Sequence, residues 1–346
     1  MSQNIRHIVI FRLSAMGDVA MTVPLVKALS EQHSSIKVTV VSRPFFKPLF
    51  DSIPNVTFFA IDVKKRHKGV LGLIRLFFDL RKLNIDAFAD LHNVLRSKIV
   101  RYLFAFIGKK TAATDKGRSQ KKELTRSVNK IFKPVSSMFE RHLETFEKLG
   151  ININLQNPTF NSYPLSPEII AIIGDKTNQK WIGIAPFAQY ESKVYPLDLM
   201  QQVIDEMSQD PTIQMFLFGG GEKEIVLLNS LASTHQNCIV VAGKLNFNQE
   251  IQLISNLDVM LSMDSGNGHI AAMLGKKVVT LWGATHPYAG FLPFQQSLEN
   301  SLTPNRELYP LLPTSIYGNK KVEGYEEAMR TITPEAILKK IHANLE

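Results

Sequence analysis

The chain of 346 residues has 45% hydrophobic and 21% charged residues, a composition typical of globular proteins that excludes a disordered or fibrous chain. Its length favours two domains over one core. A single cysteine, Cys238, excludes an internal disulfide and a thiolate metal site, and we expect it to be a small buried side chain. No apolar stretch reaches the about 18 residues that span a bilayer, and no secretory signal follows Met1, so we expect a cytoplasmic protein.

The positive charge is concentrated in one part of the first half. Residues 61–126 contain 17 Lys and Arg against 6 Asp and Glu, while the whole chain has a net charge of +9. Such a segment attracts nucleic acid, anionic lipid or phosphorylated substrates by the same Coulomb force, so charge alone does not identify the partner. For any single lysine, a solvated surface position remains the alternative.

The first half predicts a βαβ unit and further elements of a parallel sheet. Apolar runs at residues 7–11 and 38–42 predict strands, and residues 19–32 between them predict a helix. Residues 69–83 predict a further helix, residues 86–91 a strand, and residues 137–149 a helix that ends at Gly150. Because these strands are continuously apolar, we expect a parallel sheet with helices on both faces.

The second half predicts a longer alternation of strands and helices. Residues 151–180 are rich in Asn, Pro and Ser and predict the connection between two domains. We expect the first domain at residues 1–165 and the second at residues 166–346. Five strands are predicted at 181–185, 213–218, 238–241, 259–262 and 277–281, with helices at 197–208, 222–233, 248–255 and 268–274. This is the pattern of a doubly wound sheet. A last helix starts at Pro334, and the sequence leaves open whether it crosses back to the first domain.

Polar turns follow several of the predicted strands, where ligands bind in open α/β sheets. The turn after the first strand ends with Gly17 and Asp18, and Asp18 is either a helix cap or a general base. This turn matches neither a dinucleotide fingerprint nor a Walker loop. In the second half, residues 263–269 place small residues and His269 at a helix start, which suits a diphosphate. An equally weighted alternative is that His269 only makes local hydrogen bonds at the helix start.

Two more turns carry charged side chains. Lys193 follows the strand at 181–185 and could neutralise a leaving phosphate, or be a surface lysine. Glu222 follows a glycine turn and could bind ribose hydroxyls, or cap a helix. The sequence contains neither a DxD pair nor an HExxH motif, so no metal site is expected.

Taken together, these segments resemble the bacterial lipopolysaccharide heptosyltransferases, which form glycosyltransferase family 9. The similarity lies in RLSAMGDVAMTVPLVKAL from Arg12, DLHNVLRS from Asp90, IGIAPFAQYESKVYP from Ile182, FGGGEKE from Phe218 and MDSGNGHIAAMLGKKVVTLWGATHP from Met263. The matching segments follow the family's order over nearly the whole chain. The Gly-Asp turn combined with the D-S/T-G-x-x-H segment is far more specific than any single glycine-rich turn.

The resemblance implies a GT-B fold, with two Rossmann-like doubly wound parallel-sheet domains facing a central cleft. It implies an inverting transfer, without metal or cofactor, of heptose from ADP-heptose to a lipopolysaccharide core. By position, Asp18 looks like the catalytic base and Lys193 like the lysine that serves the donor phosphates. The other implied donor contacts are Asp264, Ser265, Gly266, His269 and, for the ribose, Glu222.

The resemblance also assigns the basic segment to a phosphorylated glycolipid acceptor, with peripheral contact at the cytoplasmic face of the inner membrane. The implied acceptor residues are Lys64, Lys65, Arg66, Lys68, Arg118, Lys121 and Lys122. Gln189 and Tyr190 differ from the family pattern before Lys193, as does the pair Asn267-Gly268, which leaves the donor sugar open.

Three other functions stay open. They are another nucleotide-sugar transferase, an epimerase on the same fold, and a non-catalytic protein that binds anionic glycolipid. Nucleic-acid binding is disfavoured because the basic residues match no known motif. The helix at residues 69–83 is either core-facing or a membrane-surface helix.

Overall fold

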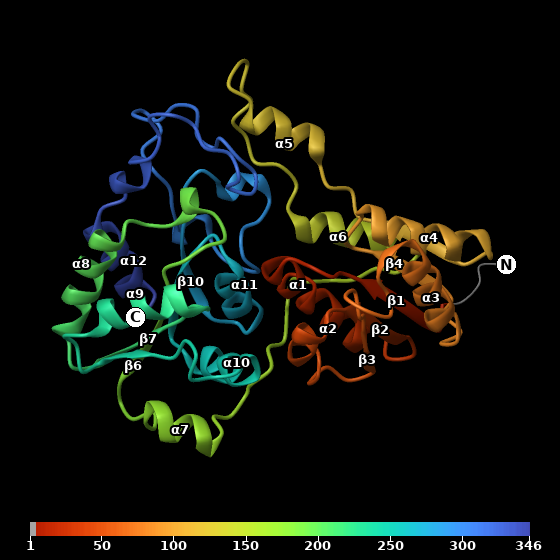
Figure 1. Ribbon diagram of the computed structural model, residues 1–346, viewed down its shortest axis with the longest axis horizontal. Helices are drawn as coiled ribbons and strands as arrows, with labels where there is room; N and C mark the ends of the chain where they lie inside the picture. Colours follow the sequence, from red (N-terminus) through yellow and green to blue (C-terminus); the bar gives the residue numbers. More distant parts are fainter. Residues whose placement is uncertain (1–4) are drawn as a thin grey trace. The chain divides into compact units, whose positions relative to one another are not determined.

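The computed structural model describes residues 5–346, which form two compact α/β units (Figure 1). Unit 1 comprises Met1–Lys116 and Ser136–Thr159, and unit 2 comprises Gly117–Val135 and Phe160–Glu346. Within the described residues, we find no helix with the length and apolar character needed to cross a membrane. Each unit is built around its own parallel sheet.

The sheet of unit 1 has five parallel strands in the order β3-β2-β1-β4-β5. Its strands are β1 (His7–Phe11), β2 (Lys37–Ser42), β3 (Val56–Ala60), β4 (Ala87–Asp90) and β5 (Lys110–Ala113). The register places Ile8 opposite Val38 on one side and Ala87 on the other. As the continuous apolar pattern predicted, β1 is buried along its whole length.

The helices of unit 1 cover both faces of this sheet. They are α1 (Met16–Ala20), α2 (Val23–Gln32), η1 (Pro44–Leu49), α3 (Gly69–Arg81), α4 (Leu95–Phe106) and α6 (Met138–Glu147). Because β2 and β4 lie on opposite sides of β1, right-handed crossovers place α1 and α2 on one face and α3 and α4 on the other. The single helix predicted at 19–32 is divided in two, with Pro24 in the first turn of α2.

The sheet of unit 2 has six parallel strands in the order β11-β10-β9-β6-β7-β8. These are β6 (Lys180–Ala185), β7 (Ile213–Leu217), β8 (Cys238–Val240), β9 (Val259–Met263), β10 (Lys277–Leu281) and β11 (Ser301–Leu302). Cys238 is buried as predicted, and burial raises the pKa of its thiol to about 12. Two parallel-sheet α/β domains are therefore present, in agreement with the predicted fold class.

The helices of unit 2 alternate with its strands. They are α7 (Pro167–Ile173), η2 (Glu191–Lys193), α8 (Leu197–Ser208), α9 (Glu222–Ala232), α10 (Phe247–Asn256), α11 (Gly266–Met273), η3 (Pro287–Ala289), η4 (Leu298–Asn300), η5 (Ala328–Thr331) and α12 (Pro334–Ala343). Ile337 and Ile341 of the terminal helix α12 join the core of unit 2, and α12 packs on α8. The hydroxyl of Tyr195 donates to the carbonyl of Ile332, 2.6 Å away, just before this helix. The C-terminal helix thus packs on its own unit.

The segment 117–135, which includes α5 (Arg118–Thr125), belongs to unit 2 although it precedes α6 of unit 1. The Lys130 ammonium donates to the carbonyls of Leu124 and Pro313, each at 2.8 Å. The guanidinium of Arg306 lies over the ring of Phe132 at 3.4 Å. We predicted this segment in the first domain and a boundary at residue 165, whereas its contacts place it in unit 2, and the later boundary between the units follows Thr159.

Candidate active site

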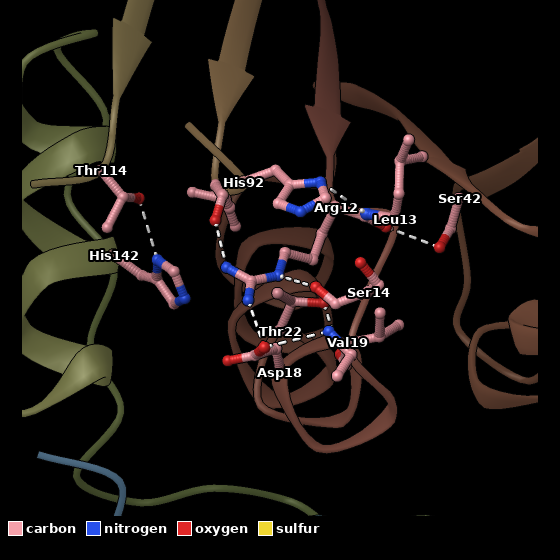
Figure 2. A network of polar contacts seen from close by, with 12 residues as sticks. Arg12, Leu13, Ser14, Asp18, Val19, Thr22, Ser42, His92, Thr114 and His142 are labelled. Atoms are coloured by element: carbon pink, nitrogen blue, oxygen red, sulfur yellow. Dashed lines mark hydrogen bonds and ion pairs between the residues drawn. The ribbon is translucent and has the colours of Figure 1, made fainter. Parts of the chain in front are cut away.

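The turn that follows β1 holds the Asp18 carboxylate through Arg12. One Asp18 oxygen lies 2.5 Å from the Arg12 guanidinium and accepts a hydrogen bond from the backbone N–H of Ala15 at 3.0 Å. The same guanidinium donates to the carbonyl of Ser14 at 2.8 Å (Figure 2) and to that of Leu91 at 2.6 Å. Arg12 is buried, while a quarter of the Asp18 side chain stays exposed (25%). A charge-assisted network therefore fixes an accessible carboxylate at the carboxyl end of β1.

Asp18 takes part in capping, though not as the N-cap residue that the sequence analysis weighed against a base. Ala15 is the N-cap of α1, and Asp18 stands at the third helical position, where its side chain accepts from the N-cap N–H. This contact uses the same oxygen that pairs with Arg12. Capping and a role as base are therefore compatible in this geometry.

His92 lies beside this turn, at the carboxyl end of β4 (Figure 2). Its Nδ1 accepts a hydrogen bond from the backbone N–H of Leu13 at 3.3 Å, so we assign the proton of the neutral ring to Nε2. Burial, together with the positive charges of Arg12, Lys116 and Arg43, lowers the pKa of His92 to about 3. His92 is therefore a neutral imidazole at physiological pH, able to donate from Nε2.

In unit 2, Lys193 and Asp264 form an ion pair between two strand ends. Lys193 follows β6 and Asp264 follows β9, and their charged atoms lie 2.9 Å apart. Thr285 is buried and donates its hydroxyl to the same Asp264 oxygen at 2.8 Å. The side chains of Lys193 and Asp264 are only 12% and 11% exposed. Lys193 is therefore not the ordinary surface lysine that the sequence left open.

Two glycines make room for Lys193. A Cβ at Gly318 would overlap the aliphatic stem of Lys193, and Gly318 also has a positive φ of 86°. A Cβ at Gly283 would overlap the carbonyl of Ser192, which accepts a hydrogen bond from Ala284 N–H at 2.9 Å. The backbone thus packs closely around Lys193 on two sides, where only glycine fits.

The segment 264–269 forms the start of α11, as predicted. Ser265 is the N-cap, Gly266 is the first helical residue, and the Ser265 hydroxyl lies 3.1 Å from that of Ser262. Gly268 packs against Ser262, where a Cβ would lie 3.2 Å from the hydroxyl oxygen, and His269 is buried one residue later. Backbone N–H groups at this helix start, next to Lys193, form an environment that favours an anion.

The sequence matches a known enzyme family over most of its length. Residues 73–311 fit glycosyltransferase family 9 (heptosyltransferase). The chain belongs to this family. It is 25% identical over 292 residues to the lipopolysaccharide core heptosyltransferase OpsX of Haemophilus influenzae, a match that covers 82% of this chain and 80% of that protein. It is thus a glycosyltransferase.

Solved structures of two glycosyltransferases share its fold. The glycosyl transferase family 9 protein of Veillonella parvula has a TM-score of 0.75 at 18% identity, covering 100% of this chain and 98% of that one. The E. coli heptosyltransferase WaaC, solved with ADP, has a TM-score of 0.68 at 17% identity, covering 98% of this chain and 99% of that one. This family 9 chain therefore has the GT-B fold.

Glu222 does not join the Lys193 group in this glycosyltransferase. It is exposed in the first turn of α9. Glu224, two residues on, turns back so that its carboxylate accepts from the backbone N–H of Gly220 at 2.7 Å. Glu224 therefore shapes the glycine turn, while a ribose contact by Glu222 stays a prediction.

The predicted acceptor residues divide between the two units. Lys64, Lys65, Arg66 and Lys68 lie in unit 1, in the exposed loop between β3 and α3, and Arg66 pairs with Asp79 at 2.8 Å. The other three lie on α5 in unit 2 and are Arg118, Lys121 and Lys122. Lys121 is buried, with its ammonium 4.1 Å from the centre of the Phe291 ring, which corrects the expectation of an exposed acceptor contact.

Sequence reasoning did not assign roles to Arg12, His92, Thr285, Gly283 or Gly318. Arg12 directly follows a buried strand and His92 closely follows another. Their positions alone therefore placed both at the edge of the sheet where ligands bind. Thr285 and the two glycines meet Asp264 and Lys193 only through tertiary contacts. Among residues 5–346, no group of three or more His, Cys, Asp or Glu is arranged to hold a metal ion.

Proposed function

We propose that this family 9 glycosyltransferase moves heptose from ADP-heptose to a sugar hydroxyl of a lipopolysaccharide core acceptor, with inversion and without a metal ion. Its Haemophilus relative is named a lipopolysaccharide core heptosyltransferase. A protein of the same fold was solved with ADP. The observation that carries the proposal is the Asp18 carboxylate, held accessible at the carboxyl end of β1 by Arg12.

Asp18 serves as the general base. The acceptor oxygen attacks the anomeric carbon from the face opposite the diphosphate, and the new C–O bond forms as the bond to the diphosphate oxygen breaks. The hydroxyl proton passes to the Asp18 carboxylate, which the Arg12 guanidinium orients. Inversion follows because one displacement takes place at one carbon, with no covalent enzyme intermediate.

Lys193 offsets the charge that develops on the leaving nucleoside diphosphate. Asp264, which accepts a hydrogen bond from Thr285, pairs with the lysine, and the glycine at 318 leaves space for the lysine stem. The N-terminus of α11, from Ser265 to His269, adds backbone N–H groups near the same pair. A positioned cation and helix N–H groups supply electrostatic stabilisation that in other transferases comes from a divalent metal.

The acceptor is a phosphorylated glycolipid, and the transfer takes place at the cytoplasmic face of the inner membrane. Lys64, Lys65 and Lys68 are exposed at the end of β3, on the same edge of the sheet as Asp18. Carboxyl ends of parallel strands share one edge, so these cations lie on the side of unit 1 that carries the base. We assign them to the phosphates of the acceptor.

The test is the Asp18→Asn variant, assayed for product formation with ADP-heptose and a core acceptor that lacks heptose. General base catalysis contributes about 10²- to 10⁴-fold, so we expect a loss of at least 100-fold in turnover. Stabilisation by ADP in a thermal-shift assay should persist, because Asp18 belongs to unit 1 and the donor groups to unit 2. Asp51→Asn is the matched control, since Asp51 pairs with the exposed Lys47 in the same unit.

Unchanged turnover of Asp18→Asn would reject Asp18 as the base. Consumption of donor in the absence of acceptor would instead favour an epimerase. The anomeric configuration of the product, read from its NMR coupling constants, tests inversion separately. Full activity in the presence of EDTA is expected, and its loss would refute the metal-independent mechanism.

A further inference from the structure

The outer faces of α3 and α4 expose a group of large apolar side chains. On α3 these residues are Val70, Leu71, Ile74 and Phe78, and on α4 they are Leu95, Tyr102 and Phe106. Leu71 is 71% exposed and Phe106 is 89% exposed. We name these seven residues the α3–α4 patch. Single exposed apolar residues are ordinary, whereas a group on two neighbouring helices marks an interaction surface.

The two helices lie side by side on one face of the unit 1 sheet (Figure 1). Leu76 and Phe77 of α3 and Phe104 of α4 join one core cluster with Phe88 of β4. The Phe77 and Phe104 rings are 4.9 Å apart. The inner sides of α3 and α4 are therefore fully packed, and the patch is a second apolar surface on the opposite, outer side.

The spacing of the patch residues confirms that they share a face. On α3, positions 70, 71, 74 and 78 follow the helical repeat, while the buried positions 72, 73, 76, 77 and 80 face the core. On α4, positions 95, 102 and 106 fall on one stripe in the same way. A helix that is apolar on both its inner and its outer side is expected where something other than water covers the outer side as well.

Positive charge surrounds this patch. Residues 61–116 of unit 1 contain 13 Lys and Arg against 5 Asp and Glu. Arg75, Arg81 and Lys82 are exposed on or directly after α3, and α4 contains no acidic residue. The one carboxylate of α3, Asp79, is mostly buried and paired with Arg66. That pairing, chiefly the hydrogen bond from Arg66, lowers the pKa of Asp79 to about 2, so the patch meets no unpaired negative charge on α3.

The patch also begins at the edge of the sheet that carries Asp18. Both α3 and α4 start at the carboxyl ends of strands, so Val70, Leu71 and Leu95 lie toward that edge. The exposed Lys64, Lys65 and Lys68 precede α3 there. Apolar side chains ringed by Lys and Arg are the composition of a surface that lies in the interface of an anionic bilayer.

We infer that the α3–α4 patch docks unit 1 onto an anionic lipid bilayer, with the apolar side chains in the acyl boundary and the basic residues among the headgroups. The inference deepens the proposed function, on which it rests for a membrane-borne acceptor. Docking by this face brings the edge that carries Asp18 to the membrane surface, where the sugar of a glycolipid is presented. No step of the chemistry depends on it.

The experiment is co-sedimentation of the full chain with vesicles of phosphatidylethanolamine and phosphatidylglycerol. We expect binding to these vesicles, weak binding to phosphatidylcholine vesicles, and a marked loss in about 0.5 M salt, where surface charges are screened within a few ångström. The double variant Phe78→Ser, Phe106→Ser should bind the vesicles at least about tenfold more weakly, because it removes two apolar anchors. Arg75→Ala should weaken binding about fivefold.

The matched control is Val226→Ser, Leu227→Ser, which removes two exposed apolar side chains from α9 of unit 2. Its vesicle binding should equal that of the wild type. Equal binding by the patch variant, or no vesicle binding by the wild type, would overturn the inference. So would a dimer, seen by analytical ultracentrifugation, that only the patch variant loses, because the patch would then bind a second copy.

Activity separates this inference from the proposed function. With acceptor embedded in vesicles, the patch variant should lose activity in parallel with binding, while a deacylated, water-soluble acceptor should be used at the wild-type rate. If neither acceptor is used by the wild type, the proposed function fails, while the vesicle-binding result still decides the docking surface.

Discussion

Replacing Asp264 with asparagine keeps the shape of the side chain and removes the negative charge that faces Lys193. The two charged groups lie 2.9 Å apart, with side chains 11% and 12% exposed. Thr285 can still donate its hydroxyl to the asparagine oxygen, so the substitution removes the ion pair and little else. Lys193 is then left as a poorly hydrated cation without its counter-charge.

The burial sets the size of the effect. Exposed ion pairs contribute about 0–1 kcal/mol, whereas removal of one partner from a buried pair costs about 3–5 kcal/mol. Since a little of each side chain reaches water, we expect Asp264→Asn to lower the free energy of unfolding by about 2 kcal/mol. In a unit of this size, that corresponds to a fall in Tm of about 4–8 °C.

The assay is thermal unfolding followed by circular dichroism in a double-mutant cycle with Lys193→Met. If the pair is coupled as the geometry indicates, the double variant should lose about 2 kcal/mol less than the sum of the two single variants. Asp198→Asn is the control, because Asp198 pairs with Arg330 in an exposed position, with side chains 58% and 42% exposed. Additive losses, or a Tm for Asp264→Asn equal to that of the control, would refute the reasoning.

Burial raises the pKa of Glu250 from 4.5 to about 7, so the folded chain retains a proton that the unfolded chain releases, and stability falls as pH rises through that window. Urea unfolding of Glu250→Gln should therefore show a gain of about 1–3 kcal/mol at about pH 8 and none at about pH 4, and an equal gain at both would contradict it. Gly318→Ala should lower the Tm and the rate of transfer, because its methyl group overlaps Lys193. Gly324 has a similar φ of 79° but open space around it, so Gly324→Ala should lose only the stability that backbone strain costs. Equal losses of Tm in the two variants would exclude a role of Gly318 in packing Lys193.

Strands inside the two sheets could be predicted from the sequence, whereas β8 was predicted among the edge strands and β3, β5 and β11 were not. The run at 7–11 is apolar throughout because β1 is covered on both faces, and the same holds for most of the strands of unit 2. β3 lies at an edge, where its residues are partly exposed, yet its sequence VTFFA is as apolar as VTVVS at 38–42, so its signal was present and was missed. β5 has only four residues, KTAA, and forms no apolar run. Because β5 was not predicted, the alternation of strands and helices that would have indicated α4, between β4 and β5, was missing.

The site could be predicted as a set of turns but not as a set of contacts. Asp18, Lys193 and Asp264 all follow buried strands, and the parallel arrangement brings strand ends to one edge of each sheet. That Lys193 pairs with Asp264 depends on the order of the strands, in which β9 lies next to β6. The requirement for glycine at 318 depends on a loop far along the chain, whose path no local pattern specifies.

The basic segment at 61–126 shows why a count of charge along the chain does not define a surface. Lys121 has an ordinary basic sequence context, yet its ammonium lies over the Phe291 ring and its side chain is buried. Lys130, four residues beyond this segment, donates to two carbonyls of unit 2, and its pKa falls to about 8 because of burial and the charge of Arg306. These lysines pack within unit 2, so the acceptor surface that we propose on unit 1 is drawn from the exposed cations before α3. Charge at Lys64, Lys65 and Lys68 should accordingly govern the use of a phosphorylated acceptor, while charge at Lys121 should govern the stability of unit 2.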